Sequence, residues 1–132
     1  MSENAIPFSL NKKSKDRLQG VHFDLVKVVQ RAIEITTCDF EVLEGVRSLT
    51  RQQQLVKAGA SQTMRSRHLT GHAVDLVAHV NGAVRWDWPL YGLIAKAMKM
   101  SARELSVPLE WGGDWKKFKD GPHFQIPWKN YP

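Results

Sequence analysis

The 132-residue sequence predicts an α+β fold in which two or three helices pack on a small, mostly antiparallel sheet. Two long segments, residues 15–35 and the residues after Pro89, have apolar side chains at helical spacing. Several shorter segments alternate apolar and polar residues or are rich in β-branched ones, which is typical of strands. Asn81-Gly82 joins two of these segments, and this dipeptide is a strong signal for an antiparallel hairpin with a type I′ turn.

The first long helix is expected over residues 15–35. Ser14 is a suitable N-cap, and Asp16 lies in the first turn, where a negative charge is favourable. His22 lies beside the apolar stripe, and we interpret it as a surface or boundary histidine rather than a ligand. The apolar residues that recur at helical spacing are Leu18, Val21, Leu25, Val28, Val29, Ala32 and Ile33.

Two further helices are expected. A short one covers residues 50–58, with Thr50 as its cap. The second long helix begins at Pro89, because proline is tolerated in a first helical turn, and it ends before Pro108. Its expected apolar face consists of Leu90, Leu93, Ile94, Ala97, Met98 and Leu105.

The expected strands are short. The clearest covers residues 73–80, which are apolar and rich in β-branched side chains, and it carries Asp75. Residues 59–67 are polar and irregular, so we expect a loop there. The other strands are expected at residues 40–46, 83–86, 109–112 and 123–126.

The length suits one domain, so we expect residues 1–132 to form a single unit without a separate binding module. Cys38 is the single cysteine, which excludes an intramolecular disulfide and a thiolate-rich zinc site. No apolar run approaches the roughly 20 residues that span a bilayer. Met1–Leu10 lacks the apolar core of a signal peptide. We therefore expect synthesis in the cytoplasm, no membrane insertion, and export only with the help of another protein.

The chain is basic, with a net charge of +6 and a pI of about 9.7. Such a protein is attracted to polyanions, which include nucleic acid, anionic lipid and anionic wall polymers. We interpret the basic cluster at residues 12–15 as a solvated face. The cluster at residues 115–119 comes just before Asp120 and could line a cleft for an anionic substrate. A small nucleic-acid-binding module is one alternative, but it assigns no role to the histidines and carboxylates described next.

Two segments combine imidazoles with carboxylates. The first places His68 and Asp75 seven residues apart, and the second places Asp120 three residues before His123. Two neutral imidazoles and one carboxylate are a common ligand set for catalytic zinc, with a position left open for water. The remaining carboxylate is then available as a general base.

His72 is the rival for the third ligand position. His68 and His72 have the spacing of the helical zinc motif H-E-x-x-H, but Leu69 stands where that motif needs glutamate. Gly71 and the β-rich sequence after it also argue against a helix. We therefore interpret His72 as a structural residue, and we give His79 no metal role.

The pattern Ser66-x-His68-x-x-Gly71-x-Ala73-x-Asp75 resembles the S-x-H-x-x-G-x-A-x-D motif of the M15 metallopeptidases, which include the VanX-type and D-Ala-D-Ala carboxypeptidases. The closing Asp120-Gly-Pro-His123-Phe resembles the final acid-x-x-His element of that family. In length, ligand spacing and N-terminus, the chain is most similar to phage endolysins that cleave the L-alanyl-D-glutamate bond of peptidoglycan. The resemblance extends from Phe40-x-x-x-x-Gly45-x-Arg47 to His123.

The resemblance implies a role for each matching residue. The zinc ligands, for one ion per chain, correspond to His68, Asp75 and His123. Asp120 corresponds to the catalytic acid/base, which is glutamate in many relatives. Arg47 corresponds to the arginine that helps to bind substrate and polarise the scissile carbonyl. Ser66 corresponds to a motif serine that contacts the substrate or supports the site.

The implied fold is that of the hedgehog/DD-peptidase group, and the implied activity is zinc-dependent cleavage of peptidoglycan stem peptides that leads to cell lysis. We expect a monomer that acts on the cell wall after the membrane has been breached. A D-alanyl-D-alanine dipeptidase or carboxypeptidase with the same zinc site is the alternative enzyme, and a catalytically dead wall-binding relative is a further one. Three aromatic residues surround the second element and are expected in the core, although one could form a wall of the substrate groove: Trp111, Trp115 and Phe124.

Overall fold

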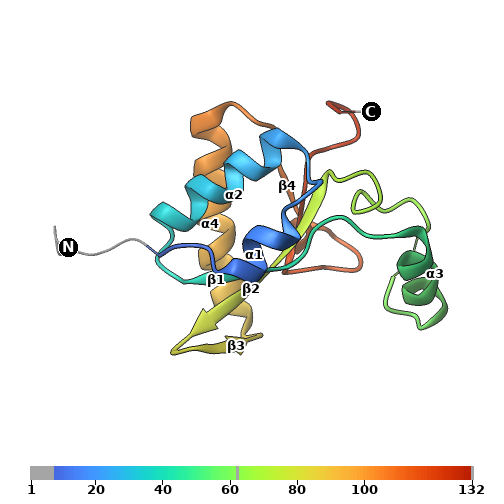
Figure 1. Cartoon of the computed structure of the whole chain (residues 1–132), viewed down its shortest axis with the longest axis horizontal. Coiled ribbons are helices and arrows are strands. Elements are labelled where there is room, and N and C mark those ends of the chain that lie inside the picture. Colours follow the sequence, from blue (N-terminus) through green and yellow to red (C-terminus); the bar gives the residue numbers. More distant parts are fainter. Residues whose placement is uncertain (1–7, 62, 132) are drawn as a thin grey trace, which may run out of the picture.

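The computed structural model describes residues 8–61 and 63–131 and has the predicted α+β architecture (Figure 1). The helices are α1 (Lys12–Arg17), α2 (Phe23–Ile35), α3 (Leu49–Lys57), α4 (Trp88–Leu105) and the short 3₁₀ helix η1 (Gly112–Asp114). The strands are β1 (Phe40–Glu44), β2 (Ala73–Val80), β3 (Ala83–Arg85), β4 (Glu110–Trp111) and β5 (His123–Gln125). None of the helices within the described ranges is long and apolar enough to cross a membrane.

Strand β2 is the centre of the sheet. The strand order is β1-β2-β5-β4, β3 also pairs with β2, and every pairing is antiparallel. The register places Asp75 of β2 opposite His123 of β5 on one side and opposite Glu44 of β1 on the other. Three chemically important side chains from distant parts of the sequence are thereby brought together.

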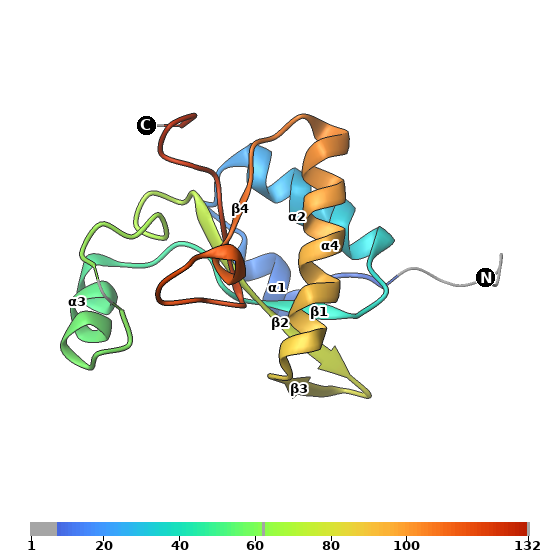
Figure 2. The same ribbon diagram turned by 180° about the vertical axis from the view of Figure 1, so that it is seen from behind.

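The hydrophobic core lies between the sheet and helices α2 and α4. Alternate residues of β2, Val74 and Leu76, are fully buried and point toward these helices, while Asp75 between them faces the other side. Burial of each such side chain stabilises the fold by about 1.5–3 kcal/mol. Helix α2 crosses close to α4, and the Ser101 hydroxyl donates to the Val28 carbonyl at 2.7 Å. Figure 2 shows that α3 and the segment after it project from the end of the molecule opposite to α2 and α4.

The helix expected over residues 15–35 is interrupted, and this prediction was wrong at its N-terminal half. The chain leaves α1 after Arg17 and turns at Gly20, whose φ is +83°, before α2 begins. Leu18 and Val21 are nevertheless buried, so the spacing of the apolar residues correctly indicated burial but not a continuous helix. His22 is the N-cap of α2, where its Nδ1 accepts from the Asp24 amide at 3.1 Å, in agreement with a boundary position.

Both predicted caps were also wrong. Asn11, not Ser14, caps the first helix, and the buried Ser14 hydroxyl instead accepts from the Val42 amide at 2.9 Å. Ser48, not Thr50, caps α3 by accepting from the Arg51 amide at 3.0 Å. In each case a side chain with suitable geometry lies slightly earlier in the chain.

The remaining boundaries lie close to the predicted ones. Strand β2 has the predicted bounds, whereas β1, β3, β4 and β5 are shorter than predicted. Asn81 and Gly82 both have positive φ, as a type I′ turn requires. Helix α4 begins at Trp88, one residue before the predicted start at Pro89, and ends at Leu105 with Ser106 as its C-cap. Leu93 was expected on its apolar face but is 41% exposed.

Candidate active site

His68, Asp75 and His123 converge on one point. Their ligand atoms all lie within 4.8 Å of one another, and among the described residues this is the one set of three or more His, Cys, Asp or Glu side chains placed to hold a metal ion. The Asp75 Oδ1 atom lies 3.1 Å from His68 Nε2 and 3.2 Å from His123 Nδ1. His68 comes from the turns before β2, and both imidazoles are buried.

The far nitrogen of each imidazole has a partner that orients the ring. His68 Nδ1 donates to the Gly45 carbonyl at 2.7 Å, and because a carbonyl only accepts, the proton of neutral His68 is on Nδ1. His123 Nε2 lies 2.7 Å from Gln125 Oε1 and donates to it in the same way. The other nitrogen of each ring then presents a lone pair to the Asp75 carboxylate. Three acceptors that face one another suit a cation, so the donor set fits zinc.

The carboxylate of the group is ionised. Burial raises the pKa of Asp75, but the adjacent His123 and His68 rings outweigh burial and hold this pKa well below its usual range. Burial lowers the pKa of His123, yet the hydrogen bond to Asp75 dominates and the pKa is raised. A proton on His123 would occupy the lone pair that a metal needs, so metal affinity should fall as the pH falls.

Asp120 lies at the end of the loop that follows η1 and lines the same cleft as the three ligands. Burial and then the nearby charge of Asp75 raise the pKa of Asp120, which increases its basicity. Gly112 makes this position possible, because a Cβ there would lie 2.4 Å from the Asp120 carbonyl oxygen and 3.1 Å from the His123 Cβ. The His123 amide donates to the same carbonyl at 3.2 Å.

Arg47 lies beside the metal group, but its guanidinium is largely engaged. Two of its nitrogens contact the Glu44 carboxylate at 2.7 and 3.1 Å, and a third donates to Gln52 Oε1 at 2.7 Å. Its Nη2 atom lies 3.6 Å from Asp75 Oδ2. Glu44 and the fully buried Gln52 therefore fix the position of Arg47. Neither Glu44 nor Gln52 was predicted as a site residue, because neither belongs to a recognised sequence motif.

Ser66 is buried and lines the cleft. Its hydroxyl accepts from the His68 amide at 3.1 Å, so it supports the turn that carries this ligand. The main chain strengthens the same connection, because the Arg47 amide donates to the His68 carbonyl at 2.9 Å. Ser66, Arg47 and His68 thus form one local unit at the edge of the cleft.

The other histidines lie outside this group. His72 Nδ1 contacts the Thr70 hydroxyl at 2.8 Å, and the His72 ring lies 5.0 Å from the His22 ring. His79 is on the same face of β2 as Asp75, but it is four residues further along, with its nitrogens 4.0 Å from the carboxylates of Asp39 and Glu41. Cys38 is a buried free cysteine away from the cleft.

The cleft has a volume of 440 Å³. Trp115 forms part of its wall, with its ring 5.2 Å from the His123 ring, whereas Trp111 stacks on Phe124 and packs against the core. The expectation that residues 115–119 could line a cleft agrees with the structure for Trp115, Lys117 and Phe118. The other lining residues were not predicted: Leu55 of α3, the loop residues Ala60, Ser61, Thr63, Arg65 and Arg67, and Gln125 of β5.

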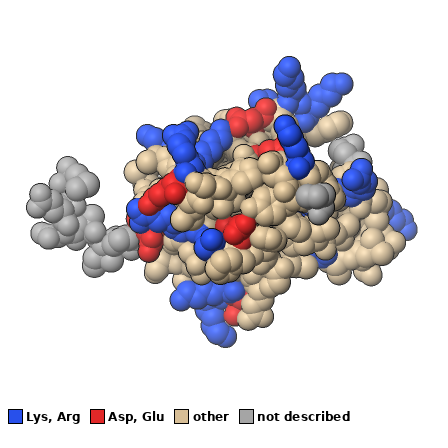
Figure 3. All heavy atoms as spheres, turned by 90° about the horizontal axis from the view of Figure 1, so that it is seen from above, with Lys and Arg blue, Asp and Glu red and all other residues tan. Residues whose placement is uncertain are grey.

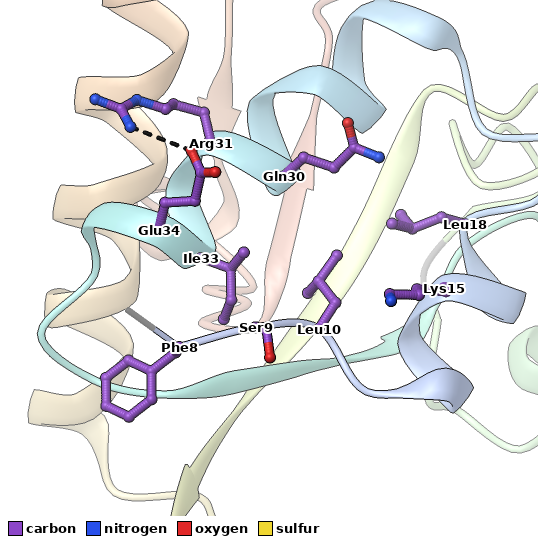
Figure 4. A pocket seen from close by; sticks show the side chains of 9 residues that line it. All are labelled: Phe8, Ser9, Leu10, Lys15, Leu18, Gln30, Arg31, Ile33 and Glu34. Atoms are coloured by element: carbon purple, nitrogen blue, oxygen red, sulfur yellow. Dashed lines mark hydrogen bonds and ion pairs between the residues drawn. The ribbon is translucent and has the colours of Figure 1, made fainter. Parts of the chain in front are cut away.

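A larger cavity of 650 Å³ lies elsewhere, between the N-terminal segment and α2 (Figure 4). Leu10, Leu18 and Ile33 form its apolar part, and an ion pair of 3.1 Å between Arg31 and Glu34 lies at its side. Among the described residues that line this cavity there is no histidine and no set of metal ligands. Its size alone therefore does not make it the candidate for chemistry.

The surface charge gives little support for a nucleic-acid-binding module. On the face shown in Figure 3, Lys and Arg side chains stand in several separate groups with acidic side chains between them. A nucleic-acid interface normally gathers basic side chains on one face or along one helix. The basic side chains on this face are thus dispersed rather than gathered in one patch.

Comparisons with known proteins identify the family of the chain. Residues 6–126 match the family described as phage L-alanyl-D-glutamate peptidase. The chain is 32% identical over 117 residues to the L-alanyl-D-glutamate peptidase of Escherichia phage T5, covering 86% of this chain and 85% of the phage protein. It is 43% identical over 90 residues to the enzyme of the same name from Listeria phage A118, covering 68% of this chain but 31% of that protein.

Solved structures show the same relationship. The L-Ala D-Glu endopeptidase ChiX of Serratia marcescens has a TM-score of 0.90 and 50% identity, with 99% of each chain covered. The D,D-dipeptidase VanXYg has a TM-score of 0.53 and 21% identity, covering 80% of this chain and 50% of the other. The second similarity concerns the fold alone.

Proposed function

Because the chain belongs to the phage L-alanyl-D-glutamate peptidase family, we propose that it is a zinc-dependent endopeptidase that cleaves the L-alanyl-D-glutamate bond of peptidoglycan stem peptides and so lyses bacterial cells. One observation carries the proposal: two buried imidazoles and the Asp75 carboxylate converge in a cleft that also holds Asp120. The similarity to ChiX and to the phage T5 enzyme supports the choice of bond.

His68 Nε2, His123 Nδ1 and the Asp75 carboxylate would hold the zinc ion. When bound, zinc supplies Lewis acidity toward the scissile carbonyl and toward water. Asp120 accepts a proton from the attacking water and passes it to the leaving amide nitrogen. The raised pKa of Asp120 suits both transfers, because an ordinary aspartate is a weak base.

Arg47 would stabilise negative charge that develops on the carbonyl oxygen. Its charge is permanent, and Glu44 and Gln52 hold it in place before substrate arrives, which lowers the cost of reorganisation. Ser66 would act mainly by supporting His68, since its hydroxyl accepts from the His68 amide.

The same proposal covers the oligomeric state, the domain organisation and the route to the cell wall. The chain would act as a monomer with one zinc ion, residues 1–132 would form one catalytic domain, and passage through the membrane to the wall would depend on another protein. The D-alanyl-D-alanine peptidase remains the alternative enzyme, and release of free D-alanine or its dipeptide from peptidoglycan would identify it.

Elemental analysis combined with a lysis assay tests the proposal. We expect one zinc per chain, and we expect lysis of permeabilised cells that stops with a chelator and returns with zinc. His68→Ala should lose both the metal and lysis, whereas the matched control His72→Ala should keep both, because His72 lies outside the ligand group. Lysis without bound metal, or a gel shift with nucleic acid and no lysis, would overturn the proposal.

A further inference from the structure

The lining of the cleft carries positive charge that the proposed chemistry does not use. Arg65, Arg67 and Lys117 all line the cleft, and we call these three residues the basic end. Among the described residues, none of the three forms an ion pair with a carboxylate. Arg47 differs, because Glu44 balances its charge at 2.7 Å.

Arg67 is the buried member of the basic end. It is 2% exposed, and its guanidinium donates to main-chain carbonyl oxygens, at 3.0 Å to Ile126 and also to Tyr131. Carbonyl oxygens satisfy the donors but do not neutralise the charge. Burial lowers the pKa of Arg67, and the nearby charge of Glu110 offsets the cost of burial only in part. An anion that enters the cleft would reduce this cost further.

Trp128 holds the two arginines together. The guanidinium carbon of Arg67 lies 4.2 Å from the centre of the indole ring, and that of Arg65 lies 4.9 Å from it. The contact with Trp128 orients the Arg65 guanidinium, while the Arg65 side chain is exposed and lines the cleft. A planar fork of N–H donors matches the two oxygens of a carboxylate better than an ammonium does.

We propose that the basic end binds the free carboxylate of the D-glutamate residue whose nitrogen is released on cleavage. Glutamate has two carboxyl groups and only one of them continues the stem peptide, so an anion lies a few bonds from the scissile nitrogen. When the scissile carbonyl lies at His68, Asp75 and His123, that anion lies in the same cleft as Arg65 and Lys117. The inference rests on the proposed function and adds to it the group that selects D-glutamate.

Two synthetic stem peptides test this assignment. One contains L-alanine joined to D-glutamate with its free carboxylate, and the other has a neutral carboxamide at that position, with the scissile bond unchanged. We expect the wild-type protein to have a kcat/KM about tenfold higher for the carboxylate peptide, the effect of one charge-assisted hydrogen bond at a partly solvated site.

Arg65→Gln and Lys117→Gln should each lower kcat/KM for the carboxylate peptide and leave the carboxamide peptide within about twofold, so that the preference shrinks. Arg65→Lys should restore part of it, because the charge is kept. Lys116→Gln and Arg103→Gln remove the same charges from exposed positions outside the cleft, and they should keep the wild-type preference. Circular dichroism checks that each variant is folded.

The outcomes distinguish failure of the proposed function from failure of the role given to the basic end. Cleavage of neither peptide by the wild-type protein would contradict the proposed function. Cleavage of both at equal rates, or a preference that survives in Arg65→Gln and Lys117→Gln, would overturn the role of the basic end while leaving the proposed function intact. An equal loss of preference in the Lys116→Gln control would also overturn it, since overall charge would then be the cause.

Discussion

Replacing Gly112 with alanine tests whether close packing behind the metal group is what positions the catalytic base. The added Cβ would lie 2.4 Å from the Asp120 carbonyl oxygen, 2.9 Å from the Asp120 Cβ and 3.1 Å from the His123 Cβ. Ordinary contacts between such atoms lie at about 3.5 Å, so the Asp120 segment must move by about 1 Å. No chemical group is removed by this change.

The expected loss of activity is large compared with the loss of stability. A displacement of about 1 Å at a reacting group costs on the order of a hundredfold in kcat. Overpacking costs about 1–3 kcal/mol in the free energy of unfolding, which a domain of ordinary stability survives. The assay is kcat on a stem peptide, with thermal unfolding and zinc content measured on the same samples.

Gly92→Ala is the matched control. Gly92 lies inside α4 with nothing within 4 Å of an added Cβ, so alanine there should raise stability by about 0.4–1 kcal/mol without changing kcat. If Gly112→Ala kept activity within about twofold of the wild-type value, the position of Asp120 would not depend on this packing, and the role given to Gly112 would be wrong.

Three further predictions concern single side chains. Asp120→Asn should lower kcat/KM by about 10²- to 10⁴-fold while one zinc per chain is retained, and loss of zinc instead would show that Asp120 is a ligand. Glu44→Gln removes the negative charge that pairs with Arg47, so it should lower kcat/KM by about tenfold with little change in zinc content. An unchanged kcat/KM would show that this ion pair is not needed to orient Arg47. The hydrogen bond from the Tyr131 hydroxyl to Asp24, at 2.6 Å, is the main reason that the pKa of Asp24 is lowered. This pair therefore stabilises the fold at pH values above the ordinary carboxyl pKa. The stabilisation is lost as the pH falls through the lowered pKa of Asp24. Tyr131→Phe should therefore reduce the acid-side decrease in the free energy of unfolding, measured by urea titration between about pH 5 and 2, and an identical pH profile in the variant would contradict the assignment.

The sequence predicted the part of the site that depends on local pattern. The β-branched run at residues 73–80 became β2 with the predicted bounds and placed Asp75 at the centre of the sheet. The prediction that His68 and His123 lie beside it agrees with the structure, because antiparallel pairing in register brings β5 to β2. These elements follow from alternation and from a compact motif.

Features that depend on the course of loops were not predicted. The break before α2 was missed because Leu18 and Val21 stay buried on both sides of a glycine turn, so their spacing continues through it. The partners of Arg47 were missed because Gln52 is a buried polar residue of a polar helix, where periodicity carries no information about its contacts. Arg67 was not predicted because it occupies a variable position of the motif, between Ser66 and His68.

Identification of the new chain ends in digested peptidoglycan tests the central claim most directly. The account predicts new N-terminal D-glutamate, absent when a chelator is present and restored when zinc is added. Release of D-alanine or its dipeptide without new N-terminal D-glutamate, or digestion that a chelator does not affect, would contradict it.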